Sequence, residues 1–425
     1  MRYQFPLHII FICIWVALAS QTRAASEWDL NDVSVLYPLP DSADNDAMIR
    51  LADKARGDSL IPARYLDRIP ALSQLQRKEE ERRSLRVIAM RFDPCFSDRV
   101  PACRRQIRMT WQPVIRSPSG GVLTIDAALH SFYDLTEEEF ARFLKELEQI
   151  RDLYGYSLKG FPLQVHPVLR HQGLNGPFAV HLKRLVLQYA GGENLTRLTF
   201  MTVAGASVFW VFGGFDIDSE GEIIPIRIPR LGESAVQQSF INASSAGDDF
   251  VKSKLLPAPS QGERWDLFLK GKKLLQNAVG EEEILTALKA AYSAENPKRH
   301  SSGTMDCVSC HVAQAAVDFG QRNFPALSLP LFEQEAYANA GFNMSQSGSG
   351  MGGSERPWHS RNLRAFGYFE TTPAISRRAI NESAEAARRL NSISPVRIGE
   401  AREYRRPGLS PPSMPTEDRG AIPVR

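Results

Sequence analysis

The spacing of apolar residues predicts two amphipathic helices in the first half of the chain. One covers residues 136–154, where Thr136 and Glu139 form a capping-box pattern at the start and Gly155 follows the end. Its apolar face is formed by five residues at helical spacing: Phe140, Phe143, Leu144, Leu147 and Ile150. The other helix covers about residues 177–189 and ends before two glycines.

Runs of β-branched, aromatic and aliphatic residues predict strands around these helices. The predicted strands are residues 85–92, 107–111, 122–127, 163–165, 195–202, 208–215 and 223–228. Strands with two intervening helices predict an α+β fold whose sheet is mainly antiparallel. Between the last two strands, the sequence DIDSEGEI is similar to the start of a calcium loop. Arg227 stands where such a loop has a bidentate Glu, so we predict a hairpin turn there.

The last third of the chain predicts a second, mainly helical domain. One helix is predicted over residues 281–292, where acidic residues open the first turn and apolar residues recur on one face. Another is predicted over about residues 375–390, and a linker rich in Pro and Ser lies near residues 252–264. We therefore expect four parts after the first 25 residues: an α+β domain at 26–255, a linker and helix lead-in at 256–280, a helical domain at 281–395 and a disordered tail at 396–425.

The first 25 residues have the pattern of a secretory signal peptide. Arg2 gives a basic start, residues 9–19 form an unbroken apolar run, and small residues follow it. The run is too short to cross ~30 Å of hydrocarbon as a helix, and an uncleaved anchor is the alternative. No later segment reaches ~18 consecutive apolar residues. We expect an exported, soluble bacterial protein, periplasmic or secreted, with no stable membrane span after cleavage near Ala19 or Ala24.

Composition excludes several classes of protein. The chain has 425 residues, of which 43% are hydrophobic and 23% charged, which excludes whole-chain disorder, collagen and a polytopic membrane protein. Its formal charge is +3, and because the first 25 residues carry two Arg and no acid, the remainder has a charge of +1. This balance argues against a dedicated nucleic-acid binder.

Cys95 and Cys103 lie between two predicted strands, in a loop that also contains Pro94 and Pro101. A disulfide between them would close the loop and stabilise the fold by ~2–3 kcal/mol. The alternative is a redox-active pair, although the spacing is not C-x-x-C. An oxidising compartment outside the cytoplasm favours the structural disulfide.

Cys307, Cys310 and His311 form the sequence Cys-Val-Ser-Cys-His. Two thiols one helical turn apart can add to the two vinyl groups of a porphyrin, and the adjacent imidazole then reaches the iron. Three alternatives remain: a plain disulfide, a zinc site completed by His300 or His359, and a thioredoxin-like redox pair. A further histidine cluster at His166, His171 and His181 fits no known zinc spacing.

The five residues from Cys307 to His311 resemble the haem-attachment motif of c-type cytochromes. The resemblance implies one covalent haem c, with thioethers to Cys307 and Cys310 and with His311 as the proximal iron ligand. In small soluble members the motif ends the first helix of the domain, whereas here Asn296-Pro297 ends the predicted helix and a polar loop precedes the motif.

The second axial ligand of the iron stays open on the sequence. Met344, Met351, His359 and His300 are candidates, and no ligand at all is the alternative. The NLRAFGYF segment, residues 362–369, is expected to pack the haem edge, to pair Arg361 and Arg364 with the haem propionates, or to be ordinary core.

Three functions follow in order of preference. The first is periplasmic single-electron transfer by a mono-haem cytochrome to or from an unknown redox partner protein. The second is a haem enzyme or sensor with an open iron position, either peroxidase-like or gas-binding. The third is an exported binding protein without haem that contains two disulfides.

Overall fold

In the computed structural model, the structure describes residues 27–74, 76–95, 104–204, 209–232, 234–241, 254–259, 280–327, 329–346 and 365–393. The predicted signal peptide, most of the predicted linker and the predicted C-terminal tail lie outside these residues. Among the described residues, no helix has the length and apolar character that crossing a membrane requires.

The centre of the protein is a ten-stranded sheet in which every described strand pair is antiparallel. Eight strands follow one path in the order β1-β4-β5-β7-β8-β9-β11-β12, while β6 pairs with β5 and β10 pairs with β9. Their bounds are β1 Ser34–Leu36, β4 Leu85–Asp93, β5 Arg105–Arg116, β6 Val122–Thr124, β7 Ala128–Leu135, β8 Leu195–Ala204, β9 Phe209–Ile217, β10 Ile223–Pro225, β11 Gln237–Ile241 and β12 Lys254–Leu256. A large antiparallel sheet combined with helices is compatible with the α+β class.

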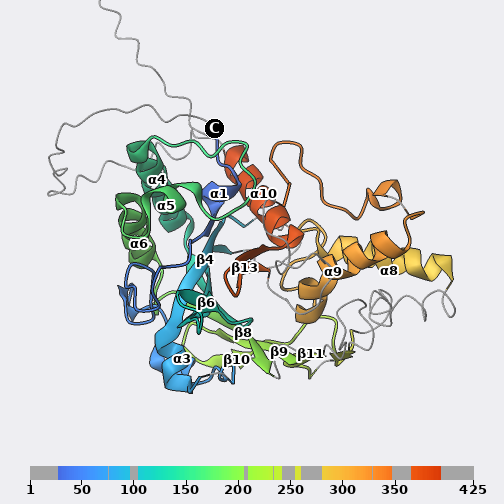
Figure 1. Cartoon of the computed structure of the whole chain (residues 1–425), viewed down its shortest axis with the longest axis horizontal. Coiled ribbons are helices and arrows are strands. Elements are labelled where there is room, and N and C mark those ends of the chain that lie inside the picture. Colours follow the sequence, from blue (N-terminus) through green and yellow to red (C-terminus); the bar gives the residue numbers. More distant parts are fainter. Residues whose placement is uncertain are drawn as a thin grey trace, which may run out of the picture.

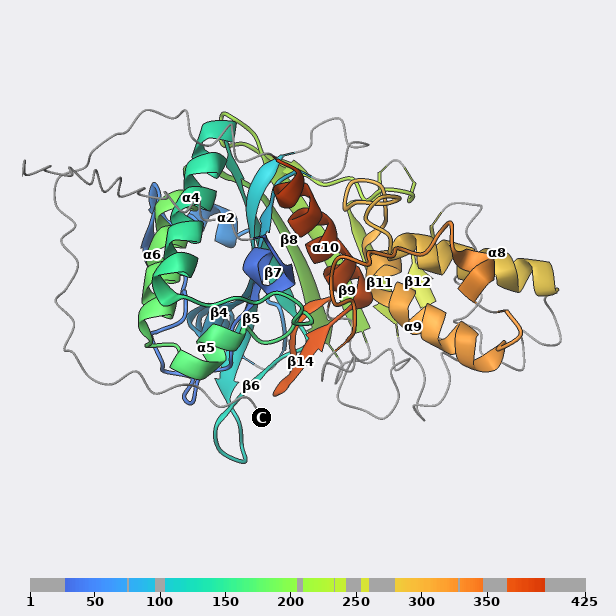
Figure 2. The same ribbon diagram turned by 90° about the horizontal axis from the view of Figure 1, so that it is seen from above.

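Helices α4 (Glu137–Tyr154), α5 (Pro167–Gln172) and α6 (Pro177–Tyr189) cover one face of the sheet (Figure 2). The ring of Phe143 on α4 lies 4.8 Å from that of Phe92 on β4 and 5.5 Å from that of Tyr189 on α6. The two predicted helices are confirmed. Both bonds of the capping box at Thr136 are present, and Gly155 ends α4 with φ of 60°.

The opposite face is covered by segments from the last third of the chain (Figures 1 and 2). Helix α9 (Cys307–Asn323) contacts β9 and β11, and helix α10 (Arg377–Ser392) contacts β4. Helix α8 (Glu281–Ala294) packs along α9, and a hairpin of β13 (Phe366–Phe369) and β14 (Thr372–Ile375) packs between the helices and β4–β6. These elements position the Cys-Val-Ser-Cys-His motif over the sheet.

Contacts distant in sequence join the first and last parts of the described chain. Trp28 and Asn391 exchange two hydrogen bonds of 2.8 and 2.9 Å, and the hydroxyls of Ser34 and Ser383 lie 2.7 Å apart. Helix α10 also contacts α1 (Leu30–Val33), and one hydrophobic core cluster extends from Leu30 to Leu390. The predicted division into two domains stays a prediction, but segments on both sides of it share this core.

The remaining elements are short. They are β2 Lys54–Ala55, β3 Asp58–Ser59, α2 Ala63–Leu66, α3 Lys78–Ser84 and a 3-10 turn at Leu329–Phe332. The strand predicted at residues 163–165 is wrong, because Val165 forms only an isolated bridge with Leu36. The hairpin turn predicted in DIDSEGEI is confirmed, with β9 paired to β10 and Gly221 at φ of 82°.

Candidate functional site

The Cys-Val-Ser-Cys-His motif forms the first turn and a half of helix α9. Asp306 is the N-cap residue, and its Oδ2 accepts a hydrogen bond of 3.0 Å from the backbone N–H of Ser309. Cys307 and Cys310 are one helical turn apart, and His311 follows. All three side chains belong to half-buried residues, so the motif is partly accessible on the folded protein.

Strand β11 anchors this helix end through one side chain. The side-chain amide of Gln238 donates to Asp306 Oδ2 at 2.8 Å, and its carbonyl oxygen accepts from the backbone N–H of Val308 at 2.9 Å. Gln238 and Asp306 are both fully buried. Because a buried polar group is expensive without partners, these bonds fix the first turn of α9 against the sheet.

The side chains of the motif contact apolar groups. The imidazole ring of His311 lies 5.0 Å from the ring of the buried Phe212 on β9, at an interplanar angle of 52°. Cys310 packs against a small cluster of Ala294, Met305 and Ala313. The imidazole therefore lies above the sheet face that α9 covers, next to the ring of Phe212.

Both thiols of the motif are free, and they are the free cysteines of the described residues. Burial raises the pKa of Cys307 to about 12, with the Asp306 carboxylate adding to the rise and the Arg197 guanidinium opposing it. Burial likewise raises the pKa of Cys310 to about 11, against an opposing effect of Arg378. Both groups are therefore neutral thiols near pH 7. The thiolate is the form that reacts in disulfide exchange and metal binding.

The sheet face beneath α9 and α10 carries a half-exposed strip over its middle strands. We call the following six side chains the central strip: Arg108 and Thr110 on β5, His130 and Phe132 on β7, and Arg197 and Thr199 on β8. Residues two apart on a strand share a face, and the strand register pairs Arg197 with Asp216, four residues from Phe212 on β9. The central strip and Phe212, which contacts His311, therefore lie on the same side of the sheet.

Charged side chains on this face form a network that links α10 to β4 and β5. Glu382 of α10 pairs with Arg91 and with Arg378, and Asp93 pairs with Arg91 at 3.2 Å and with Arg108 at 2.9 Å. Burial alone would raise the pKa of Glu382. The guanidinium groups around it, chiefly those of Arg91 and Arg378, instead hold this pKa well below its usual value.

The described candidates for the second axial position are dispersed. His300 Nε2 lies 3.1 Å from Ser293 Oγ at the end of α8, and Met344 is half-buried against the main core. Met351, His359, Arg361 and Arg364 lie outside the described residues. Among the described residues, no group of three or more His, Cys, Asp or Glu side chains is arranged to hold a metal ion.

The other predicted cysteine and histidine features lie elsewhere. Cys103 lies outside the described residues, so its disulfide with Cys95 stays a prediction. His166 stacks on Phe178 at 5.0 Å between ring centroids, whereas His181 Nδ1 lies 2.6 Å from the hydroxyl of Tyr154. His166 and His181 therefore have separate structural partners, and His171 is exposed.

The central strip was missed at the sequence level, although a signal for part of it was present. Alternation in the predicted strand 107–111 places Arg108 and Thr110 on one face, which sequence reasoning assigns to solvent. His130 and Phe132 lie on β7, which was not predicted as a strand. Only the tertiary fold brings the strip residues on β5, β7 and β8 to the same side of the sheet as the motif on α9.

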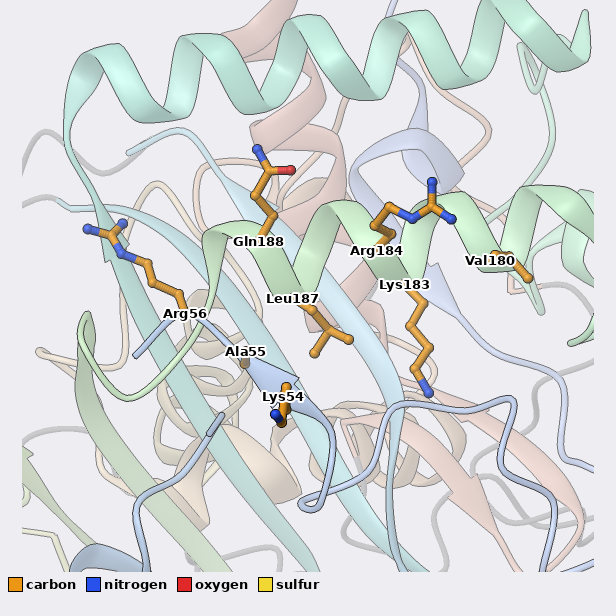
Figure 3. Close-up of a pocket in the computed structure, with 8 residues that line it drawn as sticks. All are labelled: Lys54, Ala55, Arg56, Val180, Lys183, Arg184, Leu187 and Gln188. Atoms are coloured by element: carbon orange, nitrogen blue, oxygen red, sulfur yellow. The ribbon is translucent and has the colours of Figure 1, made fainter. Parts of the chain in front are cut away.

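A surface pocket of about 570 Å³ lies between β2 and α6, on the side of the sheet opposite α9 and α10 (Figure 3). Four of its lining residues are basic: Lys54, Arg56, Lys183 and Arg184. Two of them are already paired, Lys183 with Asp53 at 2.8 Å and Arg56 with Glu139 at 2.8 Å and Glu193 at 2.9 Å. The lining contains no thiol, carboxylate, hydroxyl or imidazole, so the motif on α9 is the stronger candidate for chemistry.

Comparison of the chain with protein-family models, with curated proteins and with solved structures finds no match.

Proposed function

We propose that this protein carries one covalently attached haem c and transfers single electrons to or from a partner protein in the bacterial periplasm. Cys307 and Cys310 would hold the porphyrin through thioethers, and His311 would be the proximal iron ligand. The observation that carries this proposal is the position of Cys-Val-Ser-Cys-His on the first turns of α9 with both thiols free. When bound, the haem supplies the reversible one-electron chemistry of iron.

The chemistry of the donor set fits a haem. Each neutral thiol can add across a vinyl double bond, so that a sulfur–carbon bond forms at one carbon and a hydrogen is gained at the other. This addition needs no oxidant. Near pH 7 both thiols carry the hydrogen that this addition transfers to the vinyl group.

The surroundings of the motif support the same reading. Phe212 provides an apolar contact for the His311 ring, and an apolar environment limits the access of water and raises the reduction potential of a haem iron. The bonds of Gln238 hold the first turn of α9, so that the thiols and the imidazole keep a fixed relationship.

The experiment is expression of the full chain in a bacterial host that has the enzymes for haem attachment. The mature protein from the periplasmic fraction should be coloured, stain for haem on a denaturing gel, and have the mass of its polypeptide plus one haem. Cys307→Ala combined with Cys310→Ala should abolish the stain. Ser309→Ala, inside the motif but not at a ligand position, is the matched control and should retain it.

A colourless mature protein with the mass of the bare polypeptide would overturn the proposal. The electron-transfer part has its own test, because a carrier keeps two strong axial ligands on the iron. Addition of carbon monoxide to the reduced protein should leave the spectrum unchanged. A prompt spectral shift would replace electron transfer with ligand binding or peroxide chemistry at an open iron position.

A further inference from the structure

We propose that Arg108 and Arg197 of the central strip form a carboxylate-binding site, and that its ligands are the two propionates of the haem. This inference rests on the proposed function. It assigns a role to a sheet face on which sequence reasoning placed no functional residue.

The two arginines are related by the strand register. Arg91 pairs with Arg108, Arg108 with Phe132, Phe132 with Arg197, and Arg197 with Asp216, so these residues form one row across five strands. Neighbouring strands are ~4.8 Å apart. Arg108 and Arg197 thus stand about 10 Å apart along the row, two strand spacings, on either side of Phe132. The guanidinium carbon of Arg108 lies 5.3 Å from the centroid of the Phe132 ring.

Each guanidinium group is held in place by a carboxylate. Arg197 bonds Asp216 through Nε at 2.5 Å and through Nη2 at 2.9 Å. Arg108 bonds Gln106 through Nε at 3.1 Å and Asp93 through Nη2 at 2.9 Å. Among the described contacts, Nη1 of each arginine has no partner. The bonds at Nε and Nη2 therefore orient each guanidinium group and leave its Nη1 available as a donor.

Both arginines are accessible to a ligand yet poorly solvated. The side chains of Arg108 and Arg197 are 28% and 29% exposed. A planar guanidinium group that is partly removed from water favours a bidentate or charge-assisted bond to a carboxylate over its residual hydration.

Arg108 shares its carboxylate partner with a second guanidinium group. Burial and the neighbouring charges of Arg91 and Arg197 lower the pKa of Arg108, although Asp93 and Glu382 oppose this effect. Asp93 pairs with both Arg91 and Arg108, so one carboxylate is shared by two guanidinium groups at this point of the face. An added carboxylate would therefore lower the electrostatic free energy of this face.

The site lies on the same side of the sheet as the motif. Phe212, which contacts His311, is four residues before Asp216 on β9 and shares its face. The Arg197 charge also influences the Cys307 thiol, which places the guanidinium group within electrostatic reach of the first turn of α9. The motif and the two arginines therefore lie on the same side of the sheet.

The test uses the haem-loaded full-length protein and measures its reduction potential between pH 5 and pH 8. Arg108→Gln and Arg197→Gln should each lower the potential at pH 7 by an amount equal to about a tenfold change in the reduction equilibrium, ~59 mV for one electron. Each should also introduce a pH dependence between pH 5 and pH 7 that the wild type lacks, because a propionate without its arginine titrates at higher pH.

Arg116→Gln is the matched control, because Arg116 is on the same strand but 77% exposed. It should leave both the potential and its pH dependence unchanged. Arg197→Lys keeps the charge and loses the fork, so it should give an intermediate pH dependence. It also replaces Arg197→Gln if that variant does not fold.

Two failures are distinguishable. Coloured protein in which Arg108→Gln and Arg197→Lys both keep the wild-type pH dependence would overturn the carboxylate site and leave haem attachment standing. Protein without covalent haem would overturn the proposed function and this inference together.

Discussion

Gln238 and Asp306 form a buried side-chain pair that joins strand β11 to the start of helix α9. The amide nitrogen of Gln238 lies 2.8 Å from Asp306 Oδ2, and its oxygen lies 2.9 Å from the backbone nitrogen of Val308. One glutamine thus bonds Oδ2 of the N-cap carboxylate and a helix N–H that would otherwise have no partner within the helix. The orientation of the Cys-Val-Ser-Cys-His motif depends on this pair.

Gln238→Ala should therefore destabilise the protein by about 2–4 kcal/mol, since it removes a bond to a buried carboxylate and leaves the Val308 N–H unsatisfied. Urea denaturation at pH 7 measures the change. Gln237→Ala, on the same strand at an exposed position, is the control and should change stability by less than about 0.5 kcal/mol. Equal stability of the two variants would show that the pair contributes nothing.

His166 should make the protein sensitive to mild acid. Burial lowers the pKa of this imidazole to about 3 from its usual value of 6.5. The unfolded chain therefore binds a proton that the folded chain excludes. The stabilising effect is fully present above pH 6.5 and is lost as the pH falls toward 3, by ~1.4 kcal/mol per pH unit.

Urea denaturation at pH 7 and pH 5 should show a loss of about 2 kcal/mol from this group in the wild type. His166→Asn removes the titrating ring and keeps a good N-cap side chain, so its loss over the same interval should be smaller by that amount. His171→Asn, exposed on the same helix, should behave as the wild type. An unchanged loss in His166→Asn would contradict the prediction.

Gly367 should not tolerate a larger residue. A Cβ atom at this position would lie 2.5 Å from Gln112 Oε1 and 2.6 Å from Ile88 Cδ1, within the contact between the β13–β14 hairpin and the sheet. Gly367→Ala should destabilise the protein by ~1–3 kcal/mol in urea denaturation through overpacking. Gly232→Ala, where nothing lies within 4 Å, is the control. If the two variants are equally stable, the hairpin can shift without penalty.

The thiols of the haem-free protein should be protected by the fold. Mature protein exported from a host without haem-attachment enzymes should react with an aromatic disulfide reagent at pH 7.5 at least ~10 times more slowly when folded than in urea. The reason is that burial raises the pKa of Cys307 and Cys310 to about 12 and about 11.

The same assay counts the thiols released in urea without reductant. Two thiols per chain agree with free Cys307 and Cys310 together with a Cys95–Cys103 disulfide. Four thiols would contradict that disulfide, and equal rates in the folded and unfolded protein would contradict the protection.

Elements with local signals were predictable from the sequence. Helix α4 was predicted because Thr136, Glu139 and Gly155 define its two ends independently of the rest of the fold. Strand β7 was not predicted because its inward side includes Ser131, whose hydroxyl accepts the indole N–H of Trp111 at 2.8 Å. A buried polar residue with its own partner breaks the alternation that identifies a strand.

The surroundings of the motif were not predictable, because they come from distant residues. Gln112 looks like a surface residue of a strand, yet it is fully buried and bonds both the N–H and the carbonyl oxygen of Tyr368, 256 positions later. Arg108 and Arg197 approach each other only through β7, which pairs with both of their strands. The periodicity within one segment does not indicate which strands pair with each other or at which residues.

The bonds between Trp28 and Asn391 would set an order of events if the chain is exported as proposed. A chain that crosses a membrane from its N-terminus delivers α1 early, but α1 acquires its neighbour α10 only after residue 391 has emerged. Helix α10 also contacts α9, which carries residues 307–311, so this part of the fold is incomplete until then. Under the proposed function, this interval would leave Cys307 and Cys310 open to haem attachment before the last helix packs.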